Sequence, residues 1–240
     1  MNILVTGGAS GLGEAITRVL AKDAKNTIYF TFSNSKVNAK EIESDFGNAK
    51  SIKCDFKEES EVTTLVNKID NLNIDVLINN AYTGVAIKTY FHKIDEQDFF
   101  ADFVNNVIPT IRITQAVIAH FRKKKSGKII TILTSFLINS PPLGASCYVA
   151  NKAYLGSLVR SWANENIKFN ITSNAVSPSF MQTNLTSDVD ERIIEQMISN
   201  HPLKNLLTVE EVAETVLFLT KASSQINGVD LPINHGINIR

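Results

Sequence analysis

Thr6-Gly7-Gly8-Ala9-Ser10-Gly11-Leu12-Gly13 is the stretch that decides the fold of this 240-residue chain. It follows a short apolar run at residues 3–6 and opens a segment, 12–24, whose apolar residues recur at helical spacing. Glycine is required where a backbone turns tightly or approaches a phosphate, and a helix N-terminus offers unpaired N–H groups to an anion. The pattern predicts a strand–turn–helix unit that binds the pyrophosphate of a dinucleotide. The alternative is an ordinary glycine-rich turn.

The rest of the chain alternates short apolar runs with amphipathic segments and contains no repeat or linker. We expect strands at residues 3–6, 27–32, 49–54, 74–78, 128–133, 171–176 and 228–233. We expect helices at 12–24, 37–46, 62–69, 148–163 and 209–219, and one or two helices within 99–121. Strands that are apolar throughout need cover on both faces. The prediction is therefore an α/β fold, a doubly wound parallel sheet of Rossmann type, with residues 1–240 forming a single domain that binds ligands at the carboxyl ends of its strands.

The composition excludes several classes of protein. The 24 basic residues balance 24 acidic residues, so no global charge favours nucleic acid or an anionic membrane. Cys54 and Cys147 form no disulfide framework, and no Cys/His spacing predicts a metal site. The N-terminus lacks the features of a signal peptide, and no apolar run is long enough to span a membrane. We expect a soluble, cytoplasmic protein with reduced thiols.

The end of the second expected strand bears on which dinucleotide is bound. A carboxylate at this place accepts hydrogen bonds from the ribose 2′-hydroxyl and repels a 2′-phosphate. Here the strand ends in Ser33, Asn34, Ser35 and Lys36, with no acid. These donors favour NADP(H), while NAD(H) stays possible. The alternative is that they simply start the next helix, with Ser35 as its N-cap.

Tyr148 and Lys152 are the main candidates for acid–base chemistry. Residues four apart share one helix face, so the ammonium group can lie beside the phenol. Positive charge favours the phenolate and is expected to lower the tyrosine pKa toward the working range of a proton donor. Ser135 follows the strand at 128–133 and is expected at the ligand edge, where its hydroxyl can bind a substrate oxygen. Thr134 and Ser146 are neighbours that can be mistaken for it, and Ser135 can instead cap local backbone.

Taken together, these motifs resemble those of the short-chain dehydrogenase/reductase family in its compact form, over essentially the whole chain. The glycine loop resembles T-G-x-x-x-G-x-G, and Asn79-Asn80-Ala81 resembles the start of N-N-A-G. Among the branches of the family, the region from Ser135 to Tyr148 is most similar to that of 3-oxoacyl-[acyl-carrier-protein] reductases.

The resemblance implies a role for each matching residue. Tyr148 is the implied general acid/base, Lys152 binds ribose and tunes Tyr148, Ser135 positions substrate, and Asn106 holds a water in a proton relay. Asp55 is similar to the acid that meets adenine, and the Thr of P-G-x-x-x-T contacts the carboxamide. With the strand-end residues Ser33 and Asn34, the expected cofactor contacts are Gly7, Ser10, Gly11, Leu12, Gly13, Ser33, Asn34, Asp55, Asn79, Ala81, Tyr148, Lys152, Pro178 and Thr183.

Two positions depart from the family pattern. Tyr82 replaces the glycine of N-N-A-G, so its ring can crowd the nicotinamide pocket or form part of the substrate site. Ser179 replaces the glycine of P-G and can strain the following loop. Neither change removes a reacting group, but both leave open a nucleotide-binding sensor or scaffold with weak or vestigial reductase activity.

The resemblance also implies a lid and an assembly. Residues 179–207 form the expected substrate lid, and the expected substrate is a small carbonyl compound or one linked to an acyl carrier. The basic run Lys123-Lys124-Lys125 either docks such a carrier or is a solvated helix end. The helix at 148–163 has apolar residues on more than one face, and we expect a homotetramer, or otherwise a homodimer. A sugar-nucleotide epimerase is a third reading, but the chain is short for the extra substrate domain of those enzymes.

Overall fold

The computed structural model describes residues 1–87, 89–186 and 189–236. Its seven strands form one parallel sheet in the order β3-β2-β1-β4-β5-β6-β7. The strands are β1 (Asn2–Val5), β2 (Thr27–Phe32), β3 (Ala49–Lys53), β4 (Val76–Asn79), β5 (Gly127–Ile132), β6 (Ile171–Pro178) and β7 (Asp230–Ile233). The helices are α1 (Gly11–Ala21), α2 (Lys36–Asp45), α3 (Glu59–Leu72), α4 (Glu96–Lys124), α5 (Ser146–Asn166), α6 (Glu191–Asn200) and α7 (Val209–Lys221). The predicted doubly wound fold is confirmed.

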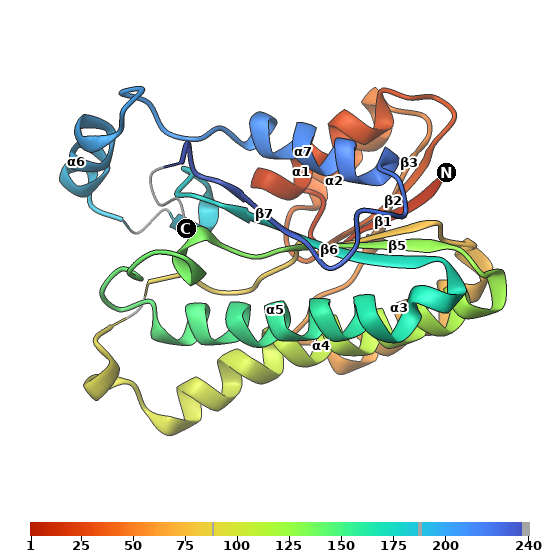
Figure 1. Cartoon of the computed structure of the whole chain (residues 1–240), viewed down its shortest axis with the longest axis horizontal. Coiled ribbons are helices and arrows are strands. Elements are labelled where there is room, and N and C mark those ends of the chain that lie inside the picture. Colours follow the sequence, from red (N-terminus) through yellow and green to blue (C-terminus); the bar gives the residue numbers. More distant parts are fainter. Residues whose placement is uncertain (88, 187–188, 237–240) are drawn as a thin grey trace.

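Helices cover the sheet on both faces, as Figure 1 shows. Helices α1, α2 and α7 pack on one face around a core that includes Ile16, Phe30 and Val216. Helices α3, α4 and α5 pack on the other face around a core that includes Leu65 and Phe121. Because β1, β4, β5 and β6 are buried on both faces, their apolar runs form the centre of the molecule.

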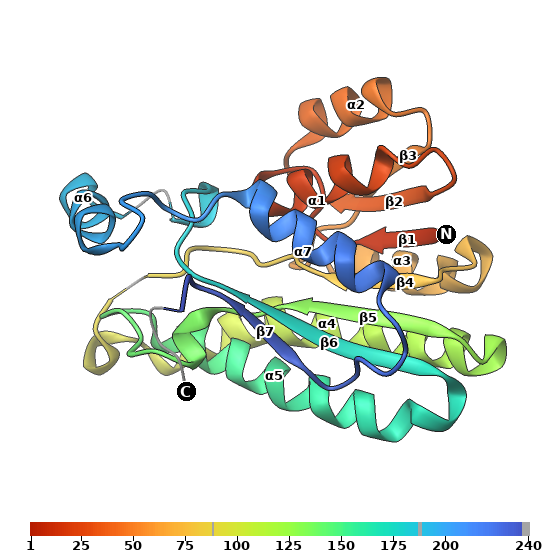
Figure 2. The same cartoon turned by 45° about the horizontal axis from the view of Figure 1, so that its top comes forward.

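The structure corrects the expected bounds at several places. The segment expected as one or two helices is a single helix, α4, which begins at Glu96 with Asp95 as its N-cap and passes through Pro109. Ser35 stands at the N-cap of α2, but its side chain makes no capping hydrogen bond. The last strand is shorter than expected and lies at the sheet edge beside β6. A helix within the expected lid segment, α6, lies beyond the carboxyl ends of the strands (Figure 2).

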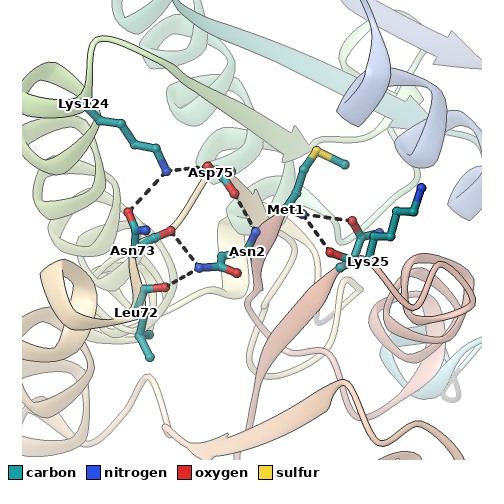
Figure 3. Close-up of polar contacts among 8 residues, drawn as sticks. Met1, Asn2, Lys25, Leu72, Asn73, Asp75 and Lys124 are labelled. Atoms are coloured by element: carbon teal, nitrogen blue, oxygen red, sulfur yellow. Dashed lines mark hydrogen bonds and ion pairs between the residues drawn. The ribbon is translucent and has the colours of Figure 1, made fainter.

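The amino edge of the sheet is fastened by polar contacts. The Asp75 carboxylate accepts a hydrogen bond from the Asn2 backbone N–H at 2.7 Å and pairs with Lys124 (Figure 3). Lys123 pairs with Asp70 on α3. The basic run therefore does not lie at the pocket rim, because these lysines stand at the amino end of β5, opposite the pocket, and two of them are ion-paired. Docking of an acyl carrier by the run stays a prediction.

Both cysteines are buried, and neither forms a disulfide in the described residues. The described residues include no helix long and apolar enough to cross a membrane. Within the same ranges, no group of His, Cys, Asp or Glu side chains is arranged to hold a metal ion.

Candidate active site

A pocket lies at the carboxyl edge of the sheet, where the loops after six of the strands meet. The residues expected there that do line it are Gly7, Ser10, Gly11, Leu12, Gly13, Ser33, Ala81, Tyr148, Lys152, Pro178 and Thr183. Tyr82, which was expected to crowd the pocket, also lines it, as do the expected lid residues Ser179, Phe180, Met181, Leu185 and Thr186. The residues that the sequence reasoning missed are Ala9, Thr31, Phe32, Ser35, Cys54, Phe56, Asn80, Thr83, Gly84, Ala86, Ile132, Leu133, Thr134 and Phe136. Most of the missed residues follow a strand, so the end of each strand was the signal available for finding them.

The glycine loop of the pocket has no room for a side chain at Gly7 or Gly13. A Cβ atom at Gly13 would lie 2.0 Å from the carbonyl oxygen of Gly7. Gly7 has a φ of +65°, and a Cβ atom there would lie 2.9 Å from the Cα atom of Ala81. Ser10 stands at the N-cap of α1 without a capping hydrogen bond and lines the pocket. The loop therefore presents backbone and one hydroxyl at a helix N-terminus, which is the donor set that a pyrophosphate needs.

Neighbouring strands hold this loop in place. The Thr31 hydroxyl at the end of β2 accepts a hydrogen bond from the Gly7 N–H at 2.8 Å. The Asn80 amide after β4 donates to the carbonyl oxygens of Thr6 and Gly7 at 2.9 and 3.2 Å. Asn79, expected as a cofactor contact, instead donates to the Thr114 hydroxyl at 3.0 Å and is not a lining residue. The bracing role therefore falls to Asn80, because its side chain faces the loop while Asn79 faces α4.

The rim after β2 carries hydroxyl groups and no lining carboxylate. Ser33 and Ser35 line the pocket, whereas Asn34 is exposed outside it. Asp55 also lies outside the lining, and its carboxylate accepts a hydrogen bond from the Lys57 N–H at 2.9 Å. Cys54 and Phe56 line the pocket on either side of it. The Asn34 and Asp55 side chains therefore lie outside the lining, and their expected contacts with the cofactor stay predictions.

Tyr148 and Lys152 lie together at the centre of the pocket, one helical turn apart on α5. The Lys152 Nζ donates to the carbonyl oxygen of Ile132 at 2.7 Å and lies 5.7 Å from the centroid of the Tyr148 ring. Burial lowers the pKa of Lys152 to about 8. Burial also raises the pKa of Tyr148 to about 12, and a hydrogen bond with the Thr134 side chain opposes that rise. The expected lowering of the Tyr148 pKa by Lys152 is therefore not seen in the cofactor-free protein, because desolvation of the phenolate dominates.

The hydroxyl beside Tyr148 belongs to Thr134, not to Ser135. Thr134 lines the pocket, and its side chain lies near enough to Tyr148 to oppose the rise in the pKa of the phenol. Ser135 is 1% exposed, begins a short 3-10 helix and is not a lining residue. The structure therefore places Thr134, and not Ser135, in the pocket lining, because β5 continues through Leu133 before the chain turns. The substrate-binding role expected of Ser135 stays a prediction.

Asn106 lies behind the pocket rather than in its lining. Its side-chain oxygen accepts from the N–H and the hydroxyl of Thr83, at 2.6 and 3.2 Å. Its amide donates to the carbonyl oxygens of Asp102 and Thr83 at 2.9 and 3.3 Å. Asn106 thus fastens α4 to the loop after β4, which carries lining residues Tyr82, Thr83 and Gly84.

Tyr82 fills the space beside the central pair. Its hydroxyl donates to the Asp102 carboxylate at 2.7 Å, and its ring meets the Tyr148 ring edge-on with centroids 5.0 Å apart. Asn151 donates to the same Asp102 oxygen at 2.9 Å. Burial and the adjacent Asp102 raise the pKa of the Tyr82 phenol, so this phenol stays protonated.

The far side of the pocket is largely apolar. Phe136, Phe180, Met181 and Leu185 line it, and Lys152 is the one charged residue in the lining of the described chain. Ser179 donates its N–H to the Ile233 carbonyl oxygen at 2.9 Å, so the loop that replaces P-G is held by β7. Residues 187 and 188 of the expected lid lie outside the described residues, while α6 lies within it.

The arrangement can bind an extended dinucleotide and transfer a proton beside it. The glycine loop and Ser10 suit the pyrophosphate, and the hydroxyl-bearing rim suits the adenosine end. Tyr148 and Thr134 supply two hydroxyl groups to an oxygen placed between them. Because the surrounding lining is apolar, those hydrogen bonds act in a medium of low polarity.

Comparisons with known proteins agree with this geometry. Residues 7–238 match a family model described as enoyl-(acyl carrier protein) reductase. The chain is 30% identical to the 3-oxoacyl-[acyl-carrier-protein] reductase FabG of Thermotoga maritima, covering 98% of this chain and 97% of that protein. It is 31% identical to carbonyl reductase family member 4 of Xenopus laevis, with the same coverage of 98% and 97%.

Solved structures share the fold. A short chain dehydrogenase/reductase family protein superposes with a TM-score of 0.85 at 28% identity, covering 97% of this chain and 95% of that chain. The 3-ketoacyl-(acyl-carrier-protein) reductase of Brucella melitensis, complexed with NADH, superposes with a TM-score of 0.87 at 23% identity, covering 99% of this chain and 98% of that chain.

Proposed function

The chain belongs to the short-chain dehydrogenase/reductase family, and from this premise we propose that it is an NADPH-dependent reductase of small or acyl-linked ketones. The observation that carries the proposal is the Tyr148–Thr134–Lys152 cluster at the end of a glycine-lined dinucleotide pocket. A bound nicotinamide cofactor supplies the hydride. The protein supplies binding, orientation and the proton.

In this proposal, Tyr148 donates its proton to the substrate oxygen. A phenol whose pKa is about 12 is protonated at neutral pH and is ready to act as a donor in the direction of reduction. Thr134, in place of the expected Ser135, holds the same oxygen through its hydroxyl. Lys152 contributes the positive charge that favours proton release by Tyr148. Asn106 is a positioning residue, because its side chain touches only α4 and the loop after β4.

The preference for NADPH over NADH is supported by the rim after β2. Ser33 and Ser35 line this rim, and no carboxylate lines the pocket in the described residues. Lys36 follows on the exposed start of α2 and can approach a 2′-phosphate. Asn34 stays a weaker candidate, since it lies outside the lining in the cofactor-free protein.

Fluorescence titration of the purified protein with NADPH and NADH tests the cofactor assignment. NADPH is expected to bind more tightly, and Ser33→Asp is expected to reverse the order because the new carboxylate repels the 2′-phosphate. Ser44→Asp adds the same charge on the exposed face of α2 and serves as the control. Tighter NADH binding by the wild-type protein contradicts the assignment.

The substrate class follows from the lining and from the relatives. A ketone with an apolar chain suits Phe136, Phe180 and Met181, and among the described residues no cation besides Lys152 lines the pocket to pair with a free carboxylate. The relatives named above include reductases of 3-oxoacyl groups on an acyl carrier and a carbonyl reductase. We therefore infer a 3-oxoacyl thioester or a related small ketone as substrate, with residues 179–207 as the lid over it.

We infer further that the protein forms a homotetramer. Apolar side chains of α4, α5 and the preceding loop are exposed, including Phe91, Phe100 and Tyr154. Strand β7 has a neighbour on one side only. An exposed apolar face and an open strand edge are features that a second copy can cover. Light scattering on the purified protein tests this inference, and a monomer contradicts it.

A further inference from the structure

We propose that Tyr82, the ring that stands where the family has glycine, is a positioning residue that holds Lys152 in its charged form beside Tyr148. This inference rests on the proposed function, because it assigns a role within the same reaction. Its basis is the geometry around one ammonium group. The Lys152 Nζ lies 5.4 Å from the centroid of the Tyr82 ring and 5.7 Å from that of the Tyr148 ring.

Lys152 needs such a partner because little else around it offsets the cost of burying its positive charge. The side chain is 4% exposed, and its one hydrogen bond in the described structure goes to the Ile132 carbonyl. No carboxylate pairs with it there. A buried ammonium ion without a counterion is costly, and the face of an aromatic ring is a source of negative potential that needs no second charge. Tyr82 therefore supplies part of what a counterion would supply.

Hydrogen bonds hold the Tyr82 ring in a defined orientation. The Tyr82 hydroxyl donates to Asp102 on α4 at 2.7 Å, and Asn151 on α5 donates to the same oxygen at 2.9 Å. Asp102 and Asn151 are 6% and 3% exposed. Because the partly buried Tyr82 meets two buried side chains from two other segments, the tyrosine ring is held in a defined position.

The titratable groups that face Lys152 are few. Tyr148 lies on its own helix, Tyr82 lies on the loop after β4, and Asp102 on α4 lies beyond the Tyr82 hydroxyl. Strand β5 contributes the Ile132 carbonyl, and the pocket residues after β6 are uncharged. A change at Tyr82 is therefore expected to act mainly on Lys152 and, through it, on Tyr148.

The test compares Tyr82→Leu and Tyr82→Phe in the pH dependence of ketone reduction. Both variants lose the hydrogen bond to Asp102, but only Tyr82→Leu loses the ring. With leucine, the basic limb of the kcat profile is expected to move to lower pH by about 0.5 to 1 unit, since a desolvated cation–π contact is worth on the order of one pKa unit. With phenylalanine, the limb is expected to keep its wild-type position, whatever the change in kcat. An unmoved limb in Tyr82→Leu, or an equal shift in both variants, overturns the proposal.

A second measurement keeps the inference separate from the proposed function. Nuclear magnetic resonance of isotope-labelled lysine in the cofactor-free protein, with Lys152→Arg to assign the signal, reports the ionisation of Lys152 without any substrate. Titration at lower pH in Tyr82→Leu than in wild type and Tyr82→Phe supports the role of the ring even if no ketone is reduced. Equal titration in all three proteins rejects it. Tyr82→Met replaces Tyr82→Leu if the latter does not fold.

Discussion

Lysine side chains have opposite environments at the two edges of the sheet. At the amino edge, Lys124 pairs with Asp75, Lys123 pairs with Asp70, and these groups are partly or largely exposed to solvent. At the carboxyl edge, Lys152 is buried and donates to a backbone carbonyl with no carboxylate beside it in the described chain. Paired, solvated charge fastens the fold at little cost, whereas an unpaired buried charge lowers stability. The difference indicates that the carboxyl edge is arranged for chemistry.

The largest expected effect at the carboxyl edge is the loss of the proton donor. Tyr148→Phe is expected to lower kcat for ketone reduction by about 10³-fold, because general acid catalysis contributes roughly 10²–10⁴-fold. Affinity for NADPH, measured by titration, is expected to change little. A variant that keeps most of its activity would show that the proton comes from elsewhere.

Two neighbouring hydroxyl groups, those of Thr134 and Ser135, are candidates for binding the substrate oxygen, and substitution distinguishes between them. Thr134→Ala is expected to lower kcat/KM by about 10²-fold, because it removes a donor to the reacting oxygen. Ser135→Ala is expected to change kcat/KM much less, since Ser135 does not line the pocket. Steady-state kinetics on both variants at matched NADPH decide the question. The reverse ranking would restore Ser135 to the role expected from the sequence.

The cost of the unpaired charge is itself measurable. Lys152→Met is expected to abolish activity yet to stabilise the fold at pH 7 by about 1–2 kcal/mol. Folding lowers the pKa of Lys152 from 10.5 to about 8, so removing this ammonium group raises the free energy of unfolding by about 3 kcal/mol. The Ile132 carbonyl then loses its hydrogen bond, which offsets about 1–2 kcal/mol of that gain.

The stability gained by Lys152→Met is expected to decrease as the pH rises. Between about pH 8 and pH 10.5, the unfolded chain binds more protons than the folded protein at Lys152, so wild-type stability rises with pH. The stability advantage of Lys152→Met is therefore full below pH 8 and disappears by about pH 10.5. Urea unfolding at several pH values checks it, and a variant less stable than wild type at pH 7 would contradict the comparison.

The amino edge gives the smallest expected effect. Lys124→Met is expected to destabilise the protein by about 0.5 kcal/mol and to leave reduction unchanged, because its pair with Asp75 is about one-third exposed and screened by solvent. Loss of this partner also raises the carboxyl pKa of Asp75, which Lys124 helps to lower. The variant is therefore expected to lose less stability than wild type when the pH falls below about 4, because its Asp75 pKa lies closer to the value in the unfolded chain. Unfolding in acid measures this, and a loss of catalytic rate would contradict the separation of the two edges.

The local sequence pattern was enough to predict the fold and the pairing of Tyr148 with Lys152. It was not enough to predict contacts between segments that are distant in the sequence. The glycine loop after an apolar strand, and the four-residue spacing of Tyr148 and Lys152, are local properties of the chain. The choice between Thr134 and Ser135 depends on the residue at which the chain leaves β5, and sequence spacing does not set that point.

The partners of Tyr82 are a stronger example of this limit. Asp102 is 20 residues away along the chain, and Asn151 reaches Asp102 across 49 residues. No periodicity links these positions, since they meet only after α4 and α5 pack on the sheet. For the same reason, the sequence did not predict that Asn34 and Asp55 lie outside the pocket lining, because the direction of a side chain on a loop depends on contacts that are absent from the local pattern.

Consumption of NADPH by the wild-type protein in the presence of a 3-oxoacyl thioester is the most direct measurement of whether this pocket is a reductase site. Oxidation of NADPH in step with loss of the ketone, absent in Tyr148→Phe, is the expected result. Binding of NADPH without any consumption across a panel of ketones would contradict the enzyme proposal and favour a nucleotide-binding sensor or scaffold.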